Sequence, residues 1–262
     1  MTFQPKLPFE LELYRSKLEA TARPFIKIIP TETGITSVLQ SKTGGTPFLP
    51  KSARYPMNSK GEPLFFLAQL NFGEMPRLEN FPEKGILQFY INNESGLGMD
   101  YQDPFNQADF RVLYFENTVE EDAASGDELP MPTPVEELPI AAGLSYPLAF
   151  ERKEEIVPLS DYQFEKLLGE DFFEPFGERQ WDIMDTYSKL NNASGHKTGG
   201  YAFFTQQDPR YRMGGLELLF QLDTDKAIHC MWGDMGVGHF FIQKEDLLSL
   251  DFSKTMFHWD CY

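Results

Sequence analysis

The sequence is poor in the groups that define several common protein classes. Only two cysteines occur among 262 residues, Cys230 and Cys261, without CxxC spacing or a nearby partner histidine. They predict two free thiols, with an inter-strand disulfide or a redox pair as the alternatives. Lysine and arginine number 23 against 40 aspartates and glutamates, a formal net charge of -17. Because this charge repels polyphosphate and anionic lipid, we expect no direct nucleic-acid or membrane binding.

Long apolar runs are also missing. Runs such as Leu64 to Ala68 fall far short of the roughly 20 residues that a membrane helix needs. The first residues contain no basic region followed by an apolar stretch and a cleavage site, so no secretory signal is predicted. The length of 262 residues suffices for a buried core without metal or disulfide support. We therefore expect a globular cytoplasmic protein.

Hydrophobic spacing predicts a mixture of short helices and strands. Leu11, Tyr14 and Leu18 recur at helical spacing, which predicts an amphipathic N-terminal helix over Phe9 to Ala22. Further helices are expected within Ser160 to Gly169, Trp181 to Leu190 and Lys244 to Leu250. Apolar, β-rich runs predict strands at Phe25 to Pro30, Ile35 to Leu39, Pro63 to Leu70, Gly85 to Ile91, Leu216 to Asp223, Gly236 to Ile242 and Thr255 to Tyr262.

Three motifs occur twice in the same order. They are a Gly-Gly pair, a Gln-Leu-Asn/Asp step, and a glycine followed by two aromatics and isoleucine. The first copies lie at Gly44-Gly45, Gln69 to Asn71 and Gly85 to Ile91, and the second at Gly199-Gly200, Gln221 to Asp223 and Gly236 to Ile242. The order predicts an internal duplication. Since only two copies exist, they should form two antiparallel β units that share one core.

The predicted fold class is therefore a β-rich α+β domain spanning 1–262. Its expected divisions are the N-terminal helix and strands (1–40), the first β unit (41–115), an acidic insert (116–151), a helical connection (152–198) and the second β unit (199–262). The insert contains five prolines and nine acidic residues, and no lysine or arginine occurs between Arg111 and Arg152. Such a segment favours a solvated, mobile loop or an excursion at the sheet edge.

Several separated motifs resemble one known family. They are Gly44-Gly45-x-Pro47, the runs Pro63 to Leu70 and Leu219 to Asp223, Trp232-Gly233-Asp234 with Gly236, and the closing Cys261-Tyr262. From about residue 40 to the carboxy terminus the chain resembles the YwqG-like family of bacterial proteins. This resemblance implies a duplicated β-rich domain and no reaction, since the family has no known function. The domain is more distantly similar to the eukaryotic programmed-cell-death-protein-two and ribosome-maturation factors, which implies chaperoning of a ribosomal protein. Family members near bacterial toxin systems imply an immunity role.

A few polar residues are candidates for a site. Gln69 and Gln221 each interrupt an apolar strand, so they either satisfy backbone groups at the junction of the two units or line a groove that the units share. Asp234, His239 and His258 lie among the last strands and are the candidates for a polar site between the units. No glycine-rich phosphate loop, calcium loop or nucleophile elbow is present, so we expect no cofactor, no metal and no assigned catalytic residue.

Two functional hypotheses follow. The first is a non-enzymatic binding module (a chaperone, adaptor or immunity factor) whose acidic surface engages a basic protein partner. The second is a small-molecule-binding or hydrolytic enzyme with its site between the β units. The second requires a concave pocket with converging polar groups, and neither hypothesis predicts an oligomeric state.

Overall fold

The computed structural model describes residues 3–31, 34, 37–130, 132 and 137–262. Within these residues ten antiparallel strands form one nearly closed sheet, in the order β10-β9-β8-β7-β1-β6-β2-β3-β4-β5. The strands are β1 (Arg23–Pro30), β2 (Lys42–Gly44), β3 (Phe65–Asn71), β4 (Ile86–Ile91), β5 (Phe110–Phe115), β6 (Ser145–Glu155), β7 (Lys197–Gly199), β8 (Leu216–Asp223), β9 (Val237–Gln243) and β10 (Met256–Asp260). The α-helices are α1 (Arg15–Glu19), α2 (Phe164–Leu168), α3 (Gln180–Leu190) and α4 (Lys244–Leu248).

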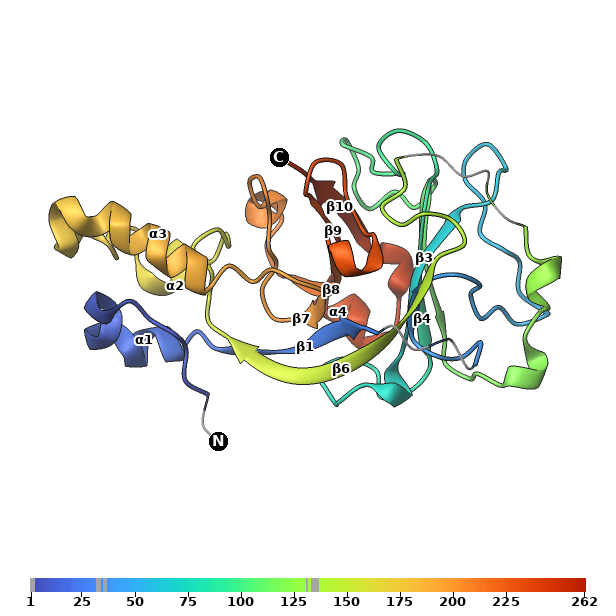
Figure 1. Ribbon diagram of the computed structural model, residues 1–262, viewed down its shortest axis with the longest axis horizontal. Coiled ribbons are helices and arrows are strands. Elements are labelled where there is room, and N and C mark those ends of the chain that lie inside the picture. The colour runs from blue at the N-terminus through green and yellow to red at the C-terminus, as the bar shows by residue number, and fades with distance from the viewer. Residues whose placement is uncertain (1–2, 32–33, 35–36, 131, 133–136) are drawn as a thin grey trace.

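The molecule is elongated, and β1 and β6 run along its length (Figure 1). Helices α1, α2 and α3 gather at one end, and β3 and β4 lie at the other (Figure 1). A separate apolar cluster, which includes Leu18, Ile156, Phe164 and Tyr187, packs these helices against the end of the sheet. The β-rich architecture predicted from the apolar runs is confirmed.

The order of the strands is symmetric about the central pair β1 and β6. On one side lie β2, β3, β4 and β5, which we call the first unit, and on the other lie β7, β8, β9 and β10, the second unit. The registers correspond as well, since Lys42 pairs with Gln69 and Lys197 pairs with Gln221. Both glutamine-bearing strands also carry a register shift just before the glutamine. In β3 the shift lies between Phe66 and Ala68, and in β8 it lies between Leu218 and Phe220.

The inner faces of the two units share one hydrophobic core. The ring of Phe89 in the first unit lies 4.7 Å, between ring centroids, from both Phe220 and Phe240 in the second. The two edge strands also meet, because the Phe110 and Phe257 rings lie 5.4 Å apart and the Phe257 N–H donates to the Pro104 carbonyl. Large aromatic rings such as these bury much apolar surface, which stabilises the shared core.

The N-terminal segment differs from the single helix expected over Phe9 to Ala22. A 3-10 helix, Phe9–Tyr14, precedes the short α1, and only Leu11 and Leu18 of the two elements are buried. Leu13 is 94% exposed. The strand expected at Ile35 to Leu39 lies partly outside the described residues, and its described part forms no strand.

Strand β6 crosses the boundary that we expected between the acidic insert and the helical connection, at residue 151. Its second half is charged and largely exposed, so the sequence there has no apolar run to reveal a central strand. The described part of the insert forms two 3-10 turns, Glu120–Asp122 and Gly126–Glu128. Backbone hydrogen bonds from Lys51 to Asp122 and from Ala124 to Leu49 anchor it, while Pro134 and Glu136 lie outside the described residues.

Candidate functional site

A groove opens where the two units meet. It has a volume of about 710 Å³ and is formed by four segments that are distant in sequence. Its lining residues are Ser95, Gly96, Leu97, Glu137, Leu138, Pro139, Ala141, Ala142, His229, Met231, Gly233 and Trp259. Most of these side chains are apolar, and Met231 is 46% exposed. The groove therefore offers apolar surface to solvent at the junction of the units.

Hydrogen bonds hold the walls of this groove in place. The Met231 N–H donates to the Pro139 carbonyl at 2.8 Å, next to an isolated bridge between Ile140 and Cys230. On the opposite wall the indole N–H of Trp259 donates to the Gly96 carbonyl at 3.0 Å. Each wall thus combines residues from both sides of the junction, so the groove is a fixed feature of the packed units.

An acidic hollow of about 410 Å³ adjoins the groove, and Ser95 lines both. The hollow contains the carboxylates of Glu94, Asp100 and Asp109. Glu94 pairs with Lys60, whereas neither of the two aspartates has an ion pair within the described part of the chain. The backbone N–H groups of the following loop donate to Asp100, which lowers the pKa of this carboxyl and keeps it ionised.

Gln69 and Gln221 are fully buried on the outer faces of their strands, where each fixes a loop. The Gln69 side chain accepts from the Phe48 N–H at 2.9 Å and donates to two carbonyls at 2.8 Å. Gln221 accepts from the Phe203 N–H at 2.9 Å and also donates to two carbonyls. Neither glutamine lines the groove. Their hydrogen bonds account for two polar side chains in apolar strands.

His239 and His258 form a cross-strand pair with ring centroids 5.8 Å apart. Burial lowers the pKa of His258 to about 4 and that of His239 well below its ordinary value. The His239 Nε2–H donates to the Phe203 carbonyl at 2.6 Å, and the Nδ1 atom of each ring is buried without a partner. Asp234 is exposed in a turn, where its carbonyl accepts from the Tyr262 N–H. The structure brings the two histidines together, and neither lines the groove.

The two cysteines are the remaining candidates for chemistry. Cys230 is buried and Cys261 is partly buried, and both thiols are free. Burial raises the pKa of Cys230, which opposes thiolate formation. Among residues whose placement is described, no three His, Cys, Asp or Glu side chains are arranged to hold a metal ion. None of the described helices is both long and apolar enough to cross a membrane.

The sequence did not reveal the groove or the acidic hollow. The groove walls come from about residues 95–97, 137–142, 229–233 and 259, so no local motif encodes them. The Gly-Gly pairs give only part of a sequence signal, because both belong to the longer repeat Lys-Thr-Gly-Gly, at residues 42–45 and 197–200. This repeat places a buried lysine at the same position in each unit.

Comparison with models of known protein families gives a match. The family model "Domain of unknown function (DUF1963)" matches residues 41–261, which covers both units, the insert and the helices between them. No curated protein matches the chain.

Proposed function

The chain belongs to the DUF1963 family, and we propose that it is a protein-binding module whose groove receives an apolar side chain from a basic segment of a partner protein. One observation carries the proposal: the apolar groove at the junction of the units adjoins a hollow that is lined by three carboxylates, of which only Glu94 has an ion pair among the described residues. The two features together match a short peptide segment with one large apolar residue and neighbouring lysines or arginines.

The apolar part of the proposal rests on the groove lining. Met231 contributes exposed apolar surface beside the largely buried Leu97 and Leu138, and Trp259 contributes an aromatic ring fixed by its hydrogen bond to Gly96. A volume of about 710 Å³ exceeds that of any single side chain, so one anchoring residue and part of its neighbours can enter. Burial of such an anchor in a rigid pocket is how interfaces gain most of their affinity.

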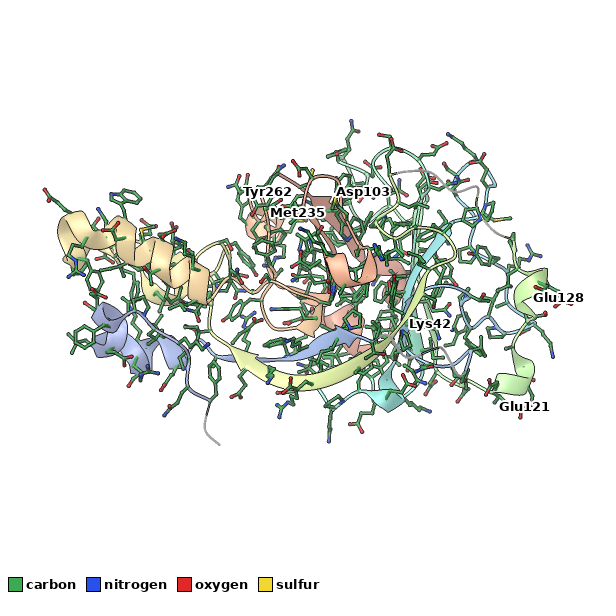
Figure 2. All side chains as sticks on the ribbon, in the orientation of Figure 1. Lys42, Asp103, Glu121, Glu128, Met235 and Tyr262 are labelled. Atoms are coloured by element: carbon green, nitrogen blue, oxygen red, sulfur yellow. The ribbon has the colours of Figure 1, made fainter. Side chains whose placement is uncertain are left out.

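The basic character of the partner follows from charge complementarity. Asp100 and Asp109 line the hollow and form no ion pair within the described part of the chain, although Lys60, which pairs with Glu94, also interacts electrostatically with Asp109. The whole chain carries a formal charge of -17. The insert adds further carboxylates at the outer edge of the molecule, where Figure 2 labels Glu121 and Glu128. Such a field accelerates association with a cationic segment and repels an acidic one. We place this encounter in the cytoplasm.

Two finer points belong to the same proposal. We infer that the units arose by internal duplication, because their strand order, glutamine registers and loop contacts correspond. We also infer kinship with YwqG-like proteins from the shared motifs, and a chaperone, adaptor or immunity role from the chemistry of the groove. The hydrolytic alternative stays a prediction. The Nδ1 atoms of His239 and His258, which have no partner among the described residues, favour it, and the burial of His239 opposes it.

The proposal is tested with synthetic peptides. A peptide with one phenylalanine between lysines should change the tryptophan fluorescence saturably, in a protein whose exposed Trp181 is replaced by phenylalanine so that only Trp259 and the buried Trp232 beside it remain. Two control peptides keep the length, one with glutamates for lysines and one with serine for phenylalanine. We expect each control to bind at least about tenfold more weakly, which is roughly 1.4 kcal/mol. Equal binding of all three peptides would contradict the proposal.

A further inference from the structure

The two Lys-Thr-Gly-Gly segments have the same backbone and different surroundings. Gly45 and Gly200 both have positive φ, 74° and 71°, and the lysines pair with equivalent glutamines. In the second unit the Lys197 ammonium donates to both oxygens of the Glu155 carboxylate, at 2.8 and 2.6 Å. The Tyr201 N–H donates to one of these oxygens at 2.8 Å. The segment is therefore a cradle for a carboxylate.

Gly200 is required for this cradle. A side-chain carbon on Gly200 would lie 2.3 Å from a Glu155 oxygen and 2.8 Å from the Cβ of Phe25. The phenyl ring of Phe25 completes the cradle, with the Lys197 ammonium 4.4 Å from the ring centroid. Glycine, carboxylate and aromatic ring thus fit together around one buried ammonium.

In the first unit the same segment lacks both the carboxylate and the ring. Ser145 pairs with Gly44 where Phe25 pairs with Gly199, so a small hydroxyl side chain replaces the phenyl ring. A side-chain carbon on Gly45 would meet only Ser145 within 4 Å. Lys42 is 2% exposed, and its ammonium donates to the Val38 carbonyl at 3.0 Å. None of the described carboxylates forms an ion pair with it.

A hollow of about 470 Å³ lies beside Lys42, and the residues that line it are Ser37, Val38, Lys42, Gly45, Thr46, Glu120 and Ser145. The backbone N–H of Thr46, the equivalent of the Tyr201 N–H, has no acceptor among the described residues. The Ser145 hydroxyl is a further donor that now contacts the Gly44 carbonyl at 3.3 Å. Figure 2 labels Lys42 at the first-unit end of β6. The donors of the carboxylate cradle are thus present beside an open space.

We propose that this hollow is a second binding site, distinct from the groove, which binds a monocarboxylate between the Lys42 ammonium, the Thr46 N–H and the Ser145 hydroxyl. The ligand carboxylate takes the place that Glu155 occupies in the second unit. No residue of this site lines the groove, so the two proposals stand independently.

Charge and burial specify the class of ligand. Glu120 lines the hollow, and Glu74 interacts electrostatically with Lys42, so two carboxylates lie near one ammonium. Because these two carboxylates repel negative charge, they disfavour a dianion such as phosphate more strongly than a singly charged acid. Burial lowers the pKa of Lys42 to about 8, and a bound carboxylate favours the charged form and raises this pKa. The site therefore favours a small acid with one carboxylate.

The test uses N-acetylglycine as a monocarboxylate and its neutral amide as the matched probe. In the isotopically labelled full chain, N-acetylglycine at about 10 mM should shift the Thr46 amide and the Lys42 Cε resonances saturably and raise the pKa of Lys42. The neutral amide and inorganic phosphate should not. Lys42→Met removes the ammonium while keeping an apolar side chain in the strand, and Ser145→Phe fills the hollow while keeping Lys42. Both variants should lose at least about tenfold in affinity.

The outcomes separate clearly. Three results would each overturn the proposal: no saturable shift, binding of phosphate equal to that of N-acetylglycine, and unchanged binding by the Lys42→Met variant. These results decide the matter even if the Ser145→Phe variant does not fold. An acetylated tripeptide with a free carboxy terminus distinguishes the source of the carboxylate. If the natural ligand is a protein chain end, the tripeptide should bind more tightly than N-acetylglycine. If the natural ligand is a free acid, the tripeptide should bind equally or more weakly. Either result supports a carboxylate site, provided that the amidated tripeptide does not bind.

Discussion

Lys197 and Glu155 form a buried ion pair that joins the second unit to the central strand β6. The lysine side chain is 1% exposed and the glutamate side chain 15%, and the lysine also donates to the Tyr201 carbonyl at 3.2 Å. Burial favours the neutral form of Lys197 and lowers its pKa, while the adjacent carboxylate opposes this shift. The charge of Lys197 in the sheet interior thus depends on Glu155.

Replacement of Glu155 by alanine should therefore destabilise the protein strongly. The change leaves a buried ammonium and the Tyr201 N–H without their acceptor, and removal of one partner from a buried pair costs about 3–5 kcal/mol. Urea unfolding followed by circular dichroism measures this loss. Glu154→Ala is the matched control, because Glu154 is the exposed neighbour on the same strand. A similar small change in both variants would show that the pair does not hold the strand.

Replacement of Gln221 by leucine should release the loop that crosses the outer face of the second unit. The Phe203 N–H and the carbonyls of Ala193 and Gly195 would lose their partner. Since each unsatisfied buried group costs roughly 1–3 kcal/mol, the free energy of unfolding should fall by at least about 2 kcal/mol. Amide exchange at Phe203 should accelerate in parallel. Gln102→Leu, at an exposed position, should leave both measurements unchanged.

Replacement of His239 by glutamine should make the protein less sensitive to acid. The folded state holds His239 neutral with a lowered pKa, so below about pH 6.5 the unfolded state binds more protons. As the pH is lowered, this group therefore reduces the free energy of unfolding by up to about 1.4 kcal/mol per pH unit. Glutamine removes the titration and can still donate to the Phe203 carbonyl, as Gln88 donates to the Phe48 carbonyl in the first unit.

Urea unfolding at several pH values between 4 and 7 measures this effect. The variant should show a shallower loss of stability below pH 6.5, with His258 and His196 still contributing because burial lowers their pKa as well. An unchanged slope would mean that His239 is already protonated in the folded protein, against the burial of its ring.

The sequence predicts the strands better than the arrangement that makes a site. Apolar runs locate β3, β4, β8 and β9 within two residues, because these strands are buried on both faces. Strand β6 is missed, since its charged half lies exposed and resembles the preceding acidic insert. The single N-terminal helix that the spacing predicts is divided into a 3-10 segment, which ends at Tyr14, and α1, which begins at Arg15. Local patterns therefore report burial, and they fail where a central strand is exposed.

The candidate site depends on relations that no local pattern contains. The buried glutamines were recognised because polar residues in apolar strands need partners, yet the loops that supply those partners pass over from distant positions. The repeat of Lys42 and Lys197 was partly visible in the Gly-Gly pairs. The different surroundings of the two lysines cannot be read from the sequence, because Lys197 pairs with Glu155, which lies on a strand that the sequence does not predict.

Removal of the carboxylates in the acidic hollow should reduce the salt dependence of peptide binding. In the double variant Asp100→Asn and Asp109→Asn, the phenylalanine-lysine peptide should associate more slowly at low salt, while its dissociation rate changes little. Stopped-flow fluorescence at several salt concentrations measures both rates. Substitution of Glu121 and Glu128 by glutamine makes the same change in net charge away from the hollow and serves as the control. Equal effects of the two double variants would indicate that only the total charge matters.

The most direct test of the groove compares two methionines. Met231 lines the groove and is 46% exposed, whereas Met235 is 45% exposed and does not line it. Met231→Lys places a charge where the apolar anchor binds, and Met235→Lys makes the same chemical change outside the groove (Figure 2). In a titration with the phenylalanine-lysine peptide, we predict that Met231→Lys weakens binding at least about tenfold and that Met235→Lys alters it less than about twofold. Equal weakening by both, or by neither, would contradict the assignment of the groove as the binding site.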